Sequence, residues 1–236
     1  MIGQLPVPPR VHATRLSKHY GATVALGDVS LKIFDGEAAA IMGPSGSGKT
    51  TLLHVLAGII RPDHGEVLLR TAPDTVDLAA LDDAARSALR LSEFGFVFQQ
   101  GLLIPELTAL ENVALPLLLT GVTRRSAEIR GQEALDQLGL EGMGARRPGQ
   151  LSGGQAQRVA IARATVTGAN TVFADEPTGA LDSHTAQDVM DALVDVASAS
   201  AGRSLVVVTH DEAVAARCSR ILRLLDGRIV SDERKS

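Results

Sequence analysis

The sequence is poor in cysteine and has no excess of positive charge. Cys218 is the one cysteine among 236 residues, which excludes an internal disulfide framework and a zinc site built from several cysteines. Lysine and arginine total 23 against 27 aspartates and glutamates, giving a net charge of −4 at pH 7. Domains that bind the nucleic-acid backbone are usually strongly basic, so we expect no nucleic-acid partner.

The sequence also lacks a long hydrophobic run. A membrane-spanning helix needs about 18 apolar residues in succession, and the best candidate, residues 113–119, is short and contains Pro116. Residues 1–9 have neither the basic start nor the apolar centre of a signal peptide, and their prolines predict a short extended tail. We therefore expect a cytoplasmic protein that reaches a membrane only through a partner.

Three short apolar runs are present, and each ends in polar residues. They span residues 38–42, 171–174 and 204–208. Continuous apolar runs of this length fit strands buried on both faces of a parallel sheet. Because ligands bind beyond the carboxyl ends of such strands, we expect the polar residues that follow the three runs to form one site.

Two further kinds of segment accompany these runs. Short strand-like segments, separated by glycine and aspartate turns, span residues 11–16, 25–33 and 65–69. They predict a small antiparallel layer beside the parallel core. Helical spacing of apolar residues predicts helices over residues 79–91 and 126–138. The stretch 102–150 is helical in character throughout, which favours a separate helical lobe.

Residues 43–50 match the phosphate-loop pattern, in which two glycines five positions apart precede Lys and Ser or Thr. The residues expected to bind phosphates here are Gly43, Pro44, Ser45, Gly46, Ser47, Gly48, Lys49, Thr50 and Thr51. Glycines let backbone N–H groups curl around phosphate oxygens, and the helix that follows points its N-terminus at them. Lys49 supplies a positive charge for the β- and γ-phosphates, and the Thr50 hydroxyl is a hard oxygen ligand suited to Mg²⁺. An ordinary glycine-rich turn is the alternative, which the flanking apolar strand and helix disfavour.

Carboxylates and a histidine follow the other two apolar runs. Asp175 and Glu176 come directly after residues 171–174. In phosphate-loop nucleotidases an aspartate at such a strand end holds Mg²⁺, and an adjacent glutamate can orient or deprotonate the attacking water. His210 follows the third run, where it can donate a hydrogen bond to a γ-phosphate or fix the water. Two solvated carboxylates and a structural histidine are the alternative interpretation.

Residues 151–155, Leu-Ser-Gly-Gly-Gln, resemble the signature of ABC-family ATPases. This pentapeptide follows the phosphate loop and precedes the acidic strand end by about 20 residues. Other motifs of that family occur in order: Tyr20 resembles the aromatic residue that stacks on adenine, and Gln99 resembles the Q-loop glutamine. Residues 179–182 resemble the D-loop, which contains Asp182, and His210 resembles the switch histidine. The resemblance extends from about residue 10 to residue 229.

The resemblance implies an α/β fold. Its parts would be a phosphate-loop NTPase core with a mostly parallel sheet and flanking helices, an antiparallel β layer and an α-helical signature lobe. We expect one ABC ATPase domain over residues 1–236. Within it we expect the tail at 1–9, the ATP-binding core at about 10–98 and 165–236, and the helical lobe at about 99–164.

The resemblance also implies ATP and Mg²⁺ as cofactors. The catalytic residues would be Glu176, His210, Gln99 and Lys49. The metal ligands would be Thr50, Gln99 and Asp175. Nucleotide contacts beyond the phosphate loop would come from Tyr20, Ser152, Gly153, Gly154, Gln155 and Asp182.

The signature residues define the expected partners. A Ser-Gly-Gly sequence before a helix offers a hydroxyl and free N–H groups, which is a second anion site at a helix N-terminus. The family resemblance implies that this site faces the γ-phosphate held by a second copy of the chain, so that a head-to-tail homodimer encloses two ATP molecules. It further implies a separate transmembrane permease, which would hold the chain at the cytoplasmic face of the cell membrane. Capping of the helix by Ser152 is compatible with both roles.

Residues 107–119 and 175–182 look like a subgroup of the family that includes macrolide exporters, lipoprotein-releasing ATPases and the cell-division ATPase FtsE. These systems export substrates or transmit motion across the membrane. Two alternatives stay open within the family: an importer of small polar solutes, and an FtsE-like regulator of cell-wall hydrolysis that transports nothing. A soluble ABC protein of DNA repair or translation is a third alternative, although the second ATPase domain, coiled coil or basic extension typical of that class is not seen in the sequence. No residue identifies a transported substrate.

Overall fold

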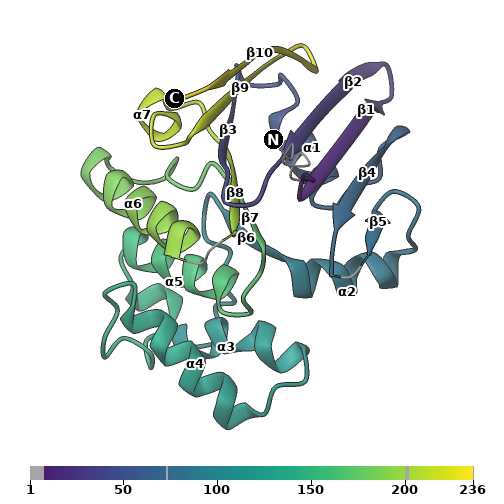
Figure 1. Ribbon diagram of the computed structural model, residues 1–236. Coiled ribbons are helices and arrows are strands. Elements are labelled where there is room, and N and C mark those ends of the chain that lie inside the picture. The colour runs from purple at the N-terminus through teal and green to yellow at the C-terminus, as the bar shows by residue number, and fades with distance from the viewer. Residues whose placement is uncertain (1–7, 73, 200–201, 236) are drawn as a thin grey trace, which may run out of the picture.

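A mostly parallel sheet forms the centre of the protein (Figure 1). The computed structural model describes residues 8–72, 74–199 and 202–235, so the first seven residues of the expected tail lie outside it. In spatial order the sheet contains β10 (Arg228–Arg234), β9 (Arg220–Leu225), β3 (Ala38–Met42), β8 (Ser204–Val208), β7 (Thr171–Asp175) and β6 (Phe94–Phe98). From β9 to β6 every neighbouring pair is parallel, and β10 is antiparallel to β9.

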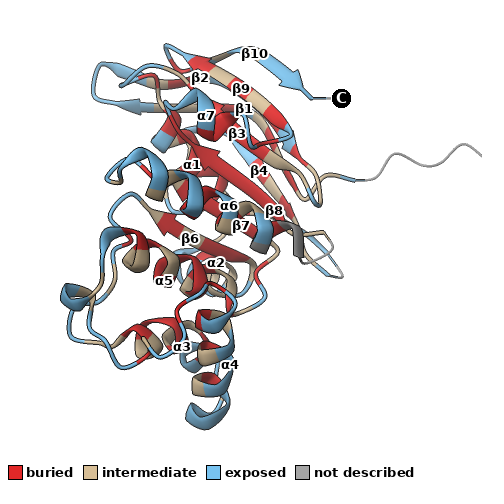
Figure 2. Cartoon of the chain, turned by 90° about the vertical axis from the view of Figure 1, so that its left-hand side faces the viewer, coloured by how far each residue is buried: buried red, intermediate tan, exposed pale blue. Residues whose placement is uncertain are grey.

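The three apolar runs form strands of the parallel sheet, as the sequence predicted, and the structure places these strands next to one another. β3, β8 and β7 are neighbours and parallel, so their carboxyl ends lie at one edge. Every residue of β8 is buried, and Figure 2 shows this central part of the sheet as the most continuously buried region. β6, β9 and β10 were not predicted; the sequences of β9 and β10 contain charged residues among the apolar ones, unlike the continuous apolar runs.

A smaller antiparallel sheet lies beside the central one, as predicted (Figure 1). Its strands, in spatial order, are β2 (Thr23–Ile33), β1 (Val11–Tyr20), β4 (His64–Arg70) and β5 (Thr75–Asp77). β1 alternates buried and less buried positions over its first residues, with Val11 and Ala13 inside. β5, a strand of three residues that pairs with β4, was not predicted from the sequence.

The helices occupy both faces of the central sheet. They are α1 (Lys49–Leu56), α2 (Asp83–Glu93), α3 (Ala109–Leu119), α4 (Arg124–Asp136), α5 (Gly153–Thr165), α6 (Ser183–Ala199) and α7 (Glu212–Ala215). The helix predicted over residues 79–91 begins at Asp83 instead, because Asp82 caps it by accepting a hydrogen bond from the Ala85 amide. Across residues 8–72, 74–199 and 202–235, none of the helices has the length and apolar composition that crossing a bilayer requires.

Successive residues of the central strands point to opposite faces of the sheet and enter two hydrophobic cores. Ala39 and Ile41 of β3 pack with α1 and the smaller sheet. Ala40 and Met42 pack on the other side with residues of α3, α5 and α6. This double burial explains why β3 has a continuous apolar sequence.

The helices α3, α4 and α5 lie together at one end of the molecule (Figure 1). α3 begins with a capping box in which Thr108 and Glu111 satisfy each other's backbone N–H groups. The fully buried Asn112 amide ties the preceding loop to α3 by donating to the Ile104 carbonyl and accepting from its N–H. α5 contacts β6, α3 and α4, so it joins this helical lobe to the edge of the central sheet.

Candidate functional site

The phosphate loop joins β3 to α1. The Lys49 ammonium crosses the loop and donates hydrogen bonds to the carbonyl oxygens of Gly43, at 2.8 Å, and Pro44, at 2.9 Å. Gly43, Gly46 and Gly48 all have positive φ angles, of 153°, 79° and 99°. Such angles strain any residue with a Cβ, so the curled loop depends on these glycines.

The loop has the properties of an anion site. Gly48 occupies the N-cap of α1 and has no side chain to cap the helix, which leaves first-turn N–H groups available to a phosphate. The Ser47 hydroxyl is buried and has no hydrogen-bond partner among the residues described. An unpaired buried hydroxyl is costly, so an anion that accepts a hydrogen bond from it would stabilise the loop. These observations fit the predicted binding of phosphates by residues 43–50.

Two hard oxygen ligands meet beside this loop. The Thr50 hydroxyl donates to a carboxylate oxygen of Asp175 at 3.2 Å, although 125 positions separate the two residues. Oxygen ligands at about 2.1 Å from Mg²⁺ in octahedral geometry lie about 3 Å apart, so the spacing fits neighbouring ligands of one ion. Burial raises the pKa of Asp175, although the Thr50 hydrogen bond opposes the change. Because a buried carboxylate is stabilised by a cation, the donor set suits Mg²⁺.

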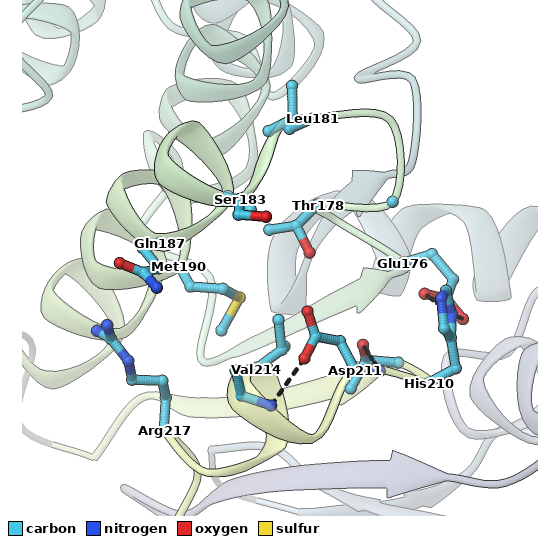
Figure 3. Close-up of a pocket in the computed structure, with 14 residues that line it drawn as sticks. Glu176, Thr178, Leu181, Ser183, Gln187, Met190, His210, Asp211, Val214 and Arg217 are labelled. Atoms are coloured by element: carbon cyan, nitrogen blue, oxygen red, sulfur yellow. Dashed lines mark hydrogen bonds and ion pairs between the residues drawn. The ribbon is translucent and has the colours of Figure 1, made fainter.

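Glu176 and His210 form a pair at the carboxyl edge of the sheet (Figure 3). The His210 Nδ1 atom lies 2.9 Å and 3.0 Å from the two carboxylate oxygens of Glu176. Glu176 has a φ of 47°, unusual for a residue with a side chain, and its N–H donates to the Val208 carbonyl at 2.9 Å. Backbone strain of this kind often occurs at functional sites. The structure thus brings together the ends of β7 and β8, as predicted.

A cavity of about 330 Å³ lies next to this pair. Figure 3 shows Thr178 and Leu181 on one side of it and Asp211, Val214 and Arg217 on another. Its walls come from the loop after β7, from α6 and from residues of 209–217, a range that includes α7. The loop after β7 therefore has open space on one side.

The signature residues begin α5. Ser152 is its N-cap and forms a capping box with Gln155, with hydrogen bonds of 3.3 Å and 3.0 Å. The helix N-terminus that we expected to offer an anion site is therefore present. Ser152 caps it, as the Ser-Gly-Gly sequence predicted. A Cβ built on Gly153 would lie 3.0 Å from a methyl carbon of Leu181, and one on Gly154 would overlap the side chain of Thr185. The signature thus contacts both the loop between β7 and α6, at Leu181, and the first turn of α6, at Thr185.

Asp182, Gln99 and Tyr20 occupy three separate places. The Asp182 carboxylate caps α6, and hydrogen bonds from the Thr185 hydroxyl and amide lower its pKa. Gln99 follows β6, and its side-chain amide lies close to Gly179. Tyr20 ends β1 in the smaller sheet, with 50% of its surface exposed and the Lys18 ammonium 5.9 Å from its ring centre.

His54 of α1 is a neighbour of Asp175 that no sequence motif singled out. Its Nε2 atom is buried without a partner among the residues described. Burial lowers the pKa of His54, while the nearby Asp175 carboxylate raises it. Its spacing in the sequence could have indicated a place near the site. His54 lies four positions after Thr50 on α1 and therefore on the same helix face.

The sequence profile of the ABC transporter family matches residues 26–179. The chain belongs to the ABC transporter family. The predicted family membership and α/β fold are thus confirmed. A solved structure of the ATP-binding cassette MJ0796 bound to ADP and Pi, described as dimeric, is 41% identical. That match covers 95% of this chain and 98% of the other, with a TM-score of 0.85.

Two kinds of relative differ in how much of their length the chain spans. The lipoprotein-releasing system ATP-binding protein LolD of Bacteroides fragilis is 39% identical over 93% of this chain and 100% of its own length. The macrolide export ATP-binding/permease protein MacB of Bradyrhizobium diazoefficiens is 47% identical over 89% of this chain. The chain spans only 31% of that longer relative. Both names fall in the export-type subgroup that the sequence predicted.

Proposed function

We propose that this chain is the ATP-hydrolysing subunit of an export-type or mechanotransmitting ABC transporter, acting on a separate permease at the cytoplasmic face of the membrane. The observation that carries the proposal is the meeting of Thr50 with Asp175 and of Glu176 with His210 at one sheet edge. Hydrolysis of ATP needs these functions together: a phosphate cradle, a cation site and a polarised water.

Each residue has a role that follows from its place. Lys49 and the phosphate-loop N–H groups bind the β- and γ-phosphates, and Thr50 and Asp175 hold Mg²⁺ together with Gln99. Mg²⁺ neutralises charge on the phosphates when bound. The Glu176 carboxylate orients and polarises the attacking water, and His210 positions that carboxylate through the hydrogen bond at Nδ1. Tyr20 stacks on the adenine.

A second copy of the chain completes the nucleotide site. Ser152 and the glycines after it lie at the N-terminus of α5, where the helix dipole favours an anion. We propose that this end of α5 and Asp182 meet the nucleotide held by the partner copy. ATP then joins the two copies, and hydrolysis weakens the contact. The dimeric state named for MJ0796 supports this arrangement.

A groove of about 500 Å³ between the sheet edge and the helical lobe suits the permease. Phe96, Phe98 and Ile104 give it an apolar floor, and Leu102 has 57% of its surface exposed. Arg90 also lines it. We propose that it receives a helical segment of the permease that carries apolar and acidic side chains. The match to the ATP-binding protein LolD of Bacteroides fragilis covers the whole of that relative, which favours a permease on a separate chain.

The test replaces the carboxylate that polarises the water. Glu176→Gln should abolish turnover and retain ATP, and with Mg-ATP it should elute as a dimer in size-exclusion chromatography with light scattering. Glu106→Gln, an exposed change in the loop before α3, is the matched control and should behave as wild type. A Glu176→Gln protein that hydrolyses ATP at the wild-type rate would overturn the assignment.

The second experiment identifies the partner. Tagged Glu176→Gln protein with Mg-ATP is used to capture proteins from detergent-solubilised native membranes, followed by mass spectrometry. A permease with a large external domain supports export or mechanotransmission. A permease that copurifies with a solute-binding protein contradicts that subgroup and leaves the ATPase assignment intact.

A further inference from the structure

The segment that follows β6 is attached to the helical lobe. The Gln157 side chain, almost fully buried on α5, donates to the Phe98 carbonyl at 2.9 Å. Arg163, further along α5, donates to the carbonyls of Gly101 at 2.7 Å and Leu102 at 2.8 Å. These three bonds hold residues 98–102 to α5, so this segment moves when the lobe moves.

Gln99 extends from this segment to the loop after β7. A Cβ built on Gly179 would lie 2.9 Å from Nε2, 3.4 Å from Cδ and 3.6 Å from Cγ of Gln99. The side chain of Gln99 therefore lies along the face of Gly179 where any other residue has its Cβ. The contact exists because position 179 has no side chain.

Gly179 is in turn bonded to the residue proposed as catalytic. Its N–H donates to the Glu176 carbonyl at 3.1 Å, closing the turn that begins with the positive φ of Glu176. Such strained backbone persists only when its surroundings hold it in place. The turn also lines the cavity, together with Thr178 and Leu181 (Figure 3). Packing around the turn is therefore incomplete, and the contact with Gln99 matters more.

We propose that Gly179 is a positioning residue for Glu176. Its missing side chain lets the Gln99 amide rest on the turn, and through this contact a movement of the lobe changes the placement of the Glu176 carboxylate. The path runs from α5 through residues 98–102 to Gln99, Gly179 and Glu176. It needs no bound nucleotide. The proposal rests on the proposed catalytic role of Glu176. The first measurement below does not depend on that role.

Gly179→Ala is a selective perturbation. Gly179 does not have a positive φ, so alanine fits its backbone. The new methyl group would have to displace the Gln99 amide by about half an ångström, because ordinary contacts begin at 3.4 Å. Gly149→Ala is the matched control, since a Cβ there meets no atom within 4 Å and its φ is also ordinary.

The first measurement is hydrogen exchange in nucleotide-free protein. Gly179→Ala should raise the exchange rate of the amides at 176–181 at least about fivefold, because a less constrained turn opens more often. Gln99→Asn, which shortens the reach of the amide, should do the same without adding any atom. Gly149→Ala should leave these amides unchanged. Wild-type exchange in both Gly179→Ala and Gln99→Asn would overturn the proposal.

The second measurement separates kcat from KM for ATP. Gly179→Ala should lower kcat about tenfold or more, because small misplacements of a catalytic group are costly, and should leave KM within about twofold, because the phosphate loop is unaltered. In a Gln99→Ala background Gly179→Ala should neither lower the remaining kcat nor raise exchange further. An equal effect in both backgrounds would show that alanine acts on the backbone alone, which contradicts the proposal, and an unchanged kcat in Gly179→Ala would contradict it as well.

Discussion

Two glycines of the phosphate loop should respond very differently to the same substitution. Gly46 and Gly48 both have positive φ, at 79° and 99°. A Cβ built on Gly46 meets no atom within 4 Å, whereas one on Gly48 overlaps the backbone carbonyl oxygen of Ala25. A backbone carbonyl in a paired strand cannot rotate away as a flexible side chain can. Gly48→Ala should therefore be the more damaging change.

The expected magnitudes follow from these surroundings. Forcing a residue with a Cβ into the left-handed region costs about 1–2 kcal/mol, and replacing glycine reduces the entropy of the unfolded chain, which returns about 0.4–1 kcal/mol. Gly46→Ala should therefore lower the free energy of unfolding by about 1 kcal/mol. Overpacking against fixed atoms adds about 1–3 kcal/mol, so Gly48→Ala should lower it by about 3 kcal/mol.

The assay is urea unfolding of the nucleotide-free variants, followed by circular dichroism. Both variants should keep the wild-type dependence of free energy on urea, and only the midpoint should move. Relief of the overlap requires the loop to shift at the N-terminus of α1, so Gly48→Ala should also bind a fluorescent ATP analogue more weakly than wild type. If Gly48→Ala is as stable as Gly46→Ala, the reasoning from the Ala25 carbonyl is refuted.

Three further predictions concern the rest of the fold. Arg220 is buried and lies 3.1 Å from the carboxylate of Glu37, whose side chain is only 9% exposed. Arg220→Leu should cost about 3 kcal/mol in urea unfolding, and a loss under about 1 kcal/mol would contradict this ion-pair argument. Burial raises the pKa of Cys218 to about 11, so a thiol reagent at about pH 8 should label it only after unfolding, and rapid labelling of native protein would count against its burial. The hydrogen bond from Lys18 lowers the pKa of Asp63 from 3.8 to about 2. This interaction should stabilise the fold above about pH 4 and be lost as the pH falls towards 2. An Asp63 NMR titration midpoint near 3.8 in wild type, or one that Lys18→Met leaves unchanged, would disprove the effect.

The motifs of the site could be predicted because each is local. Residues 43–50 specify a curled loop through the positions of their glycines, and residues 152–155 specify a capped helix start. The buried strands could also be predicted, because a strand covered on both faces is apolar at every position. Their parallel order then places Asp175, Glu176 and His210 at one edge of the sheet.

Strands β9 and β10 and the start of α2 could not be predicted from the sequence. β9 and β10 contain charged residues among their apolar ones. Arg220 of β9 is buried because Glu37 and Asp232 pair with it. A charged residue in a sequence signals exposure unless its partners are known. The start of α2 depended on which of several polar residues became the cap.

Sequence alone determined which functional groups follow the carboxyl end of each central strand. Residue type and spacing along the chain set the backbone geometry at those positions. Only the tertiary structure decided which of these groups touch. The approach of Gln99 to Gly179 and of His54 to Asp175 joins residues that lie 80 or more positions apart. Such contacts follow from how helices and strands pack against one another, and side-chain packing across that distance leaves no periodic pattern in the sequence.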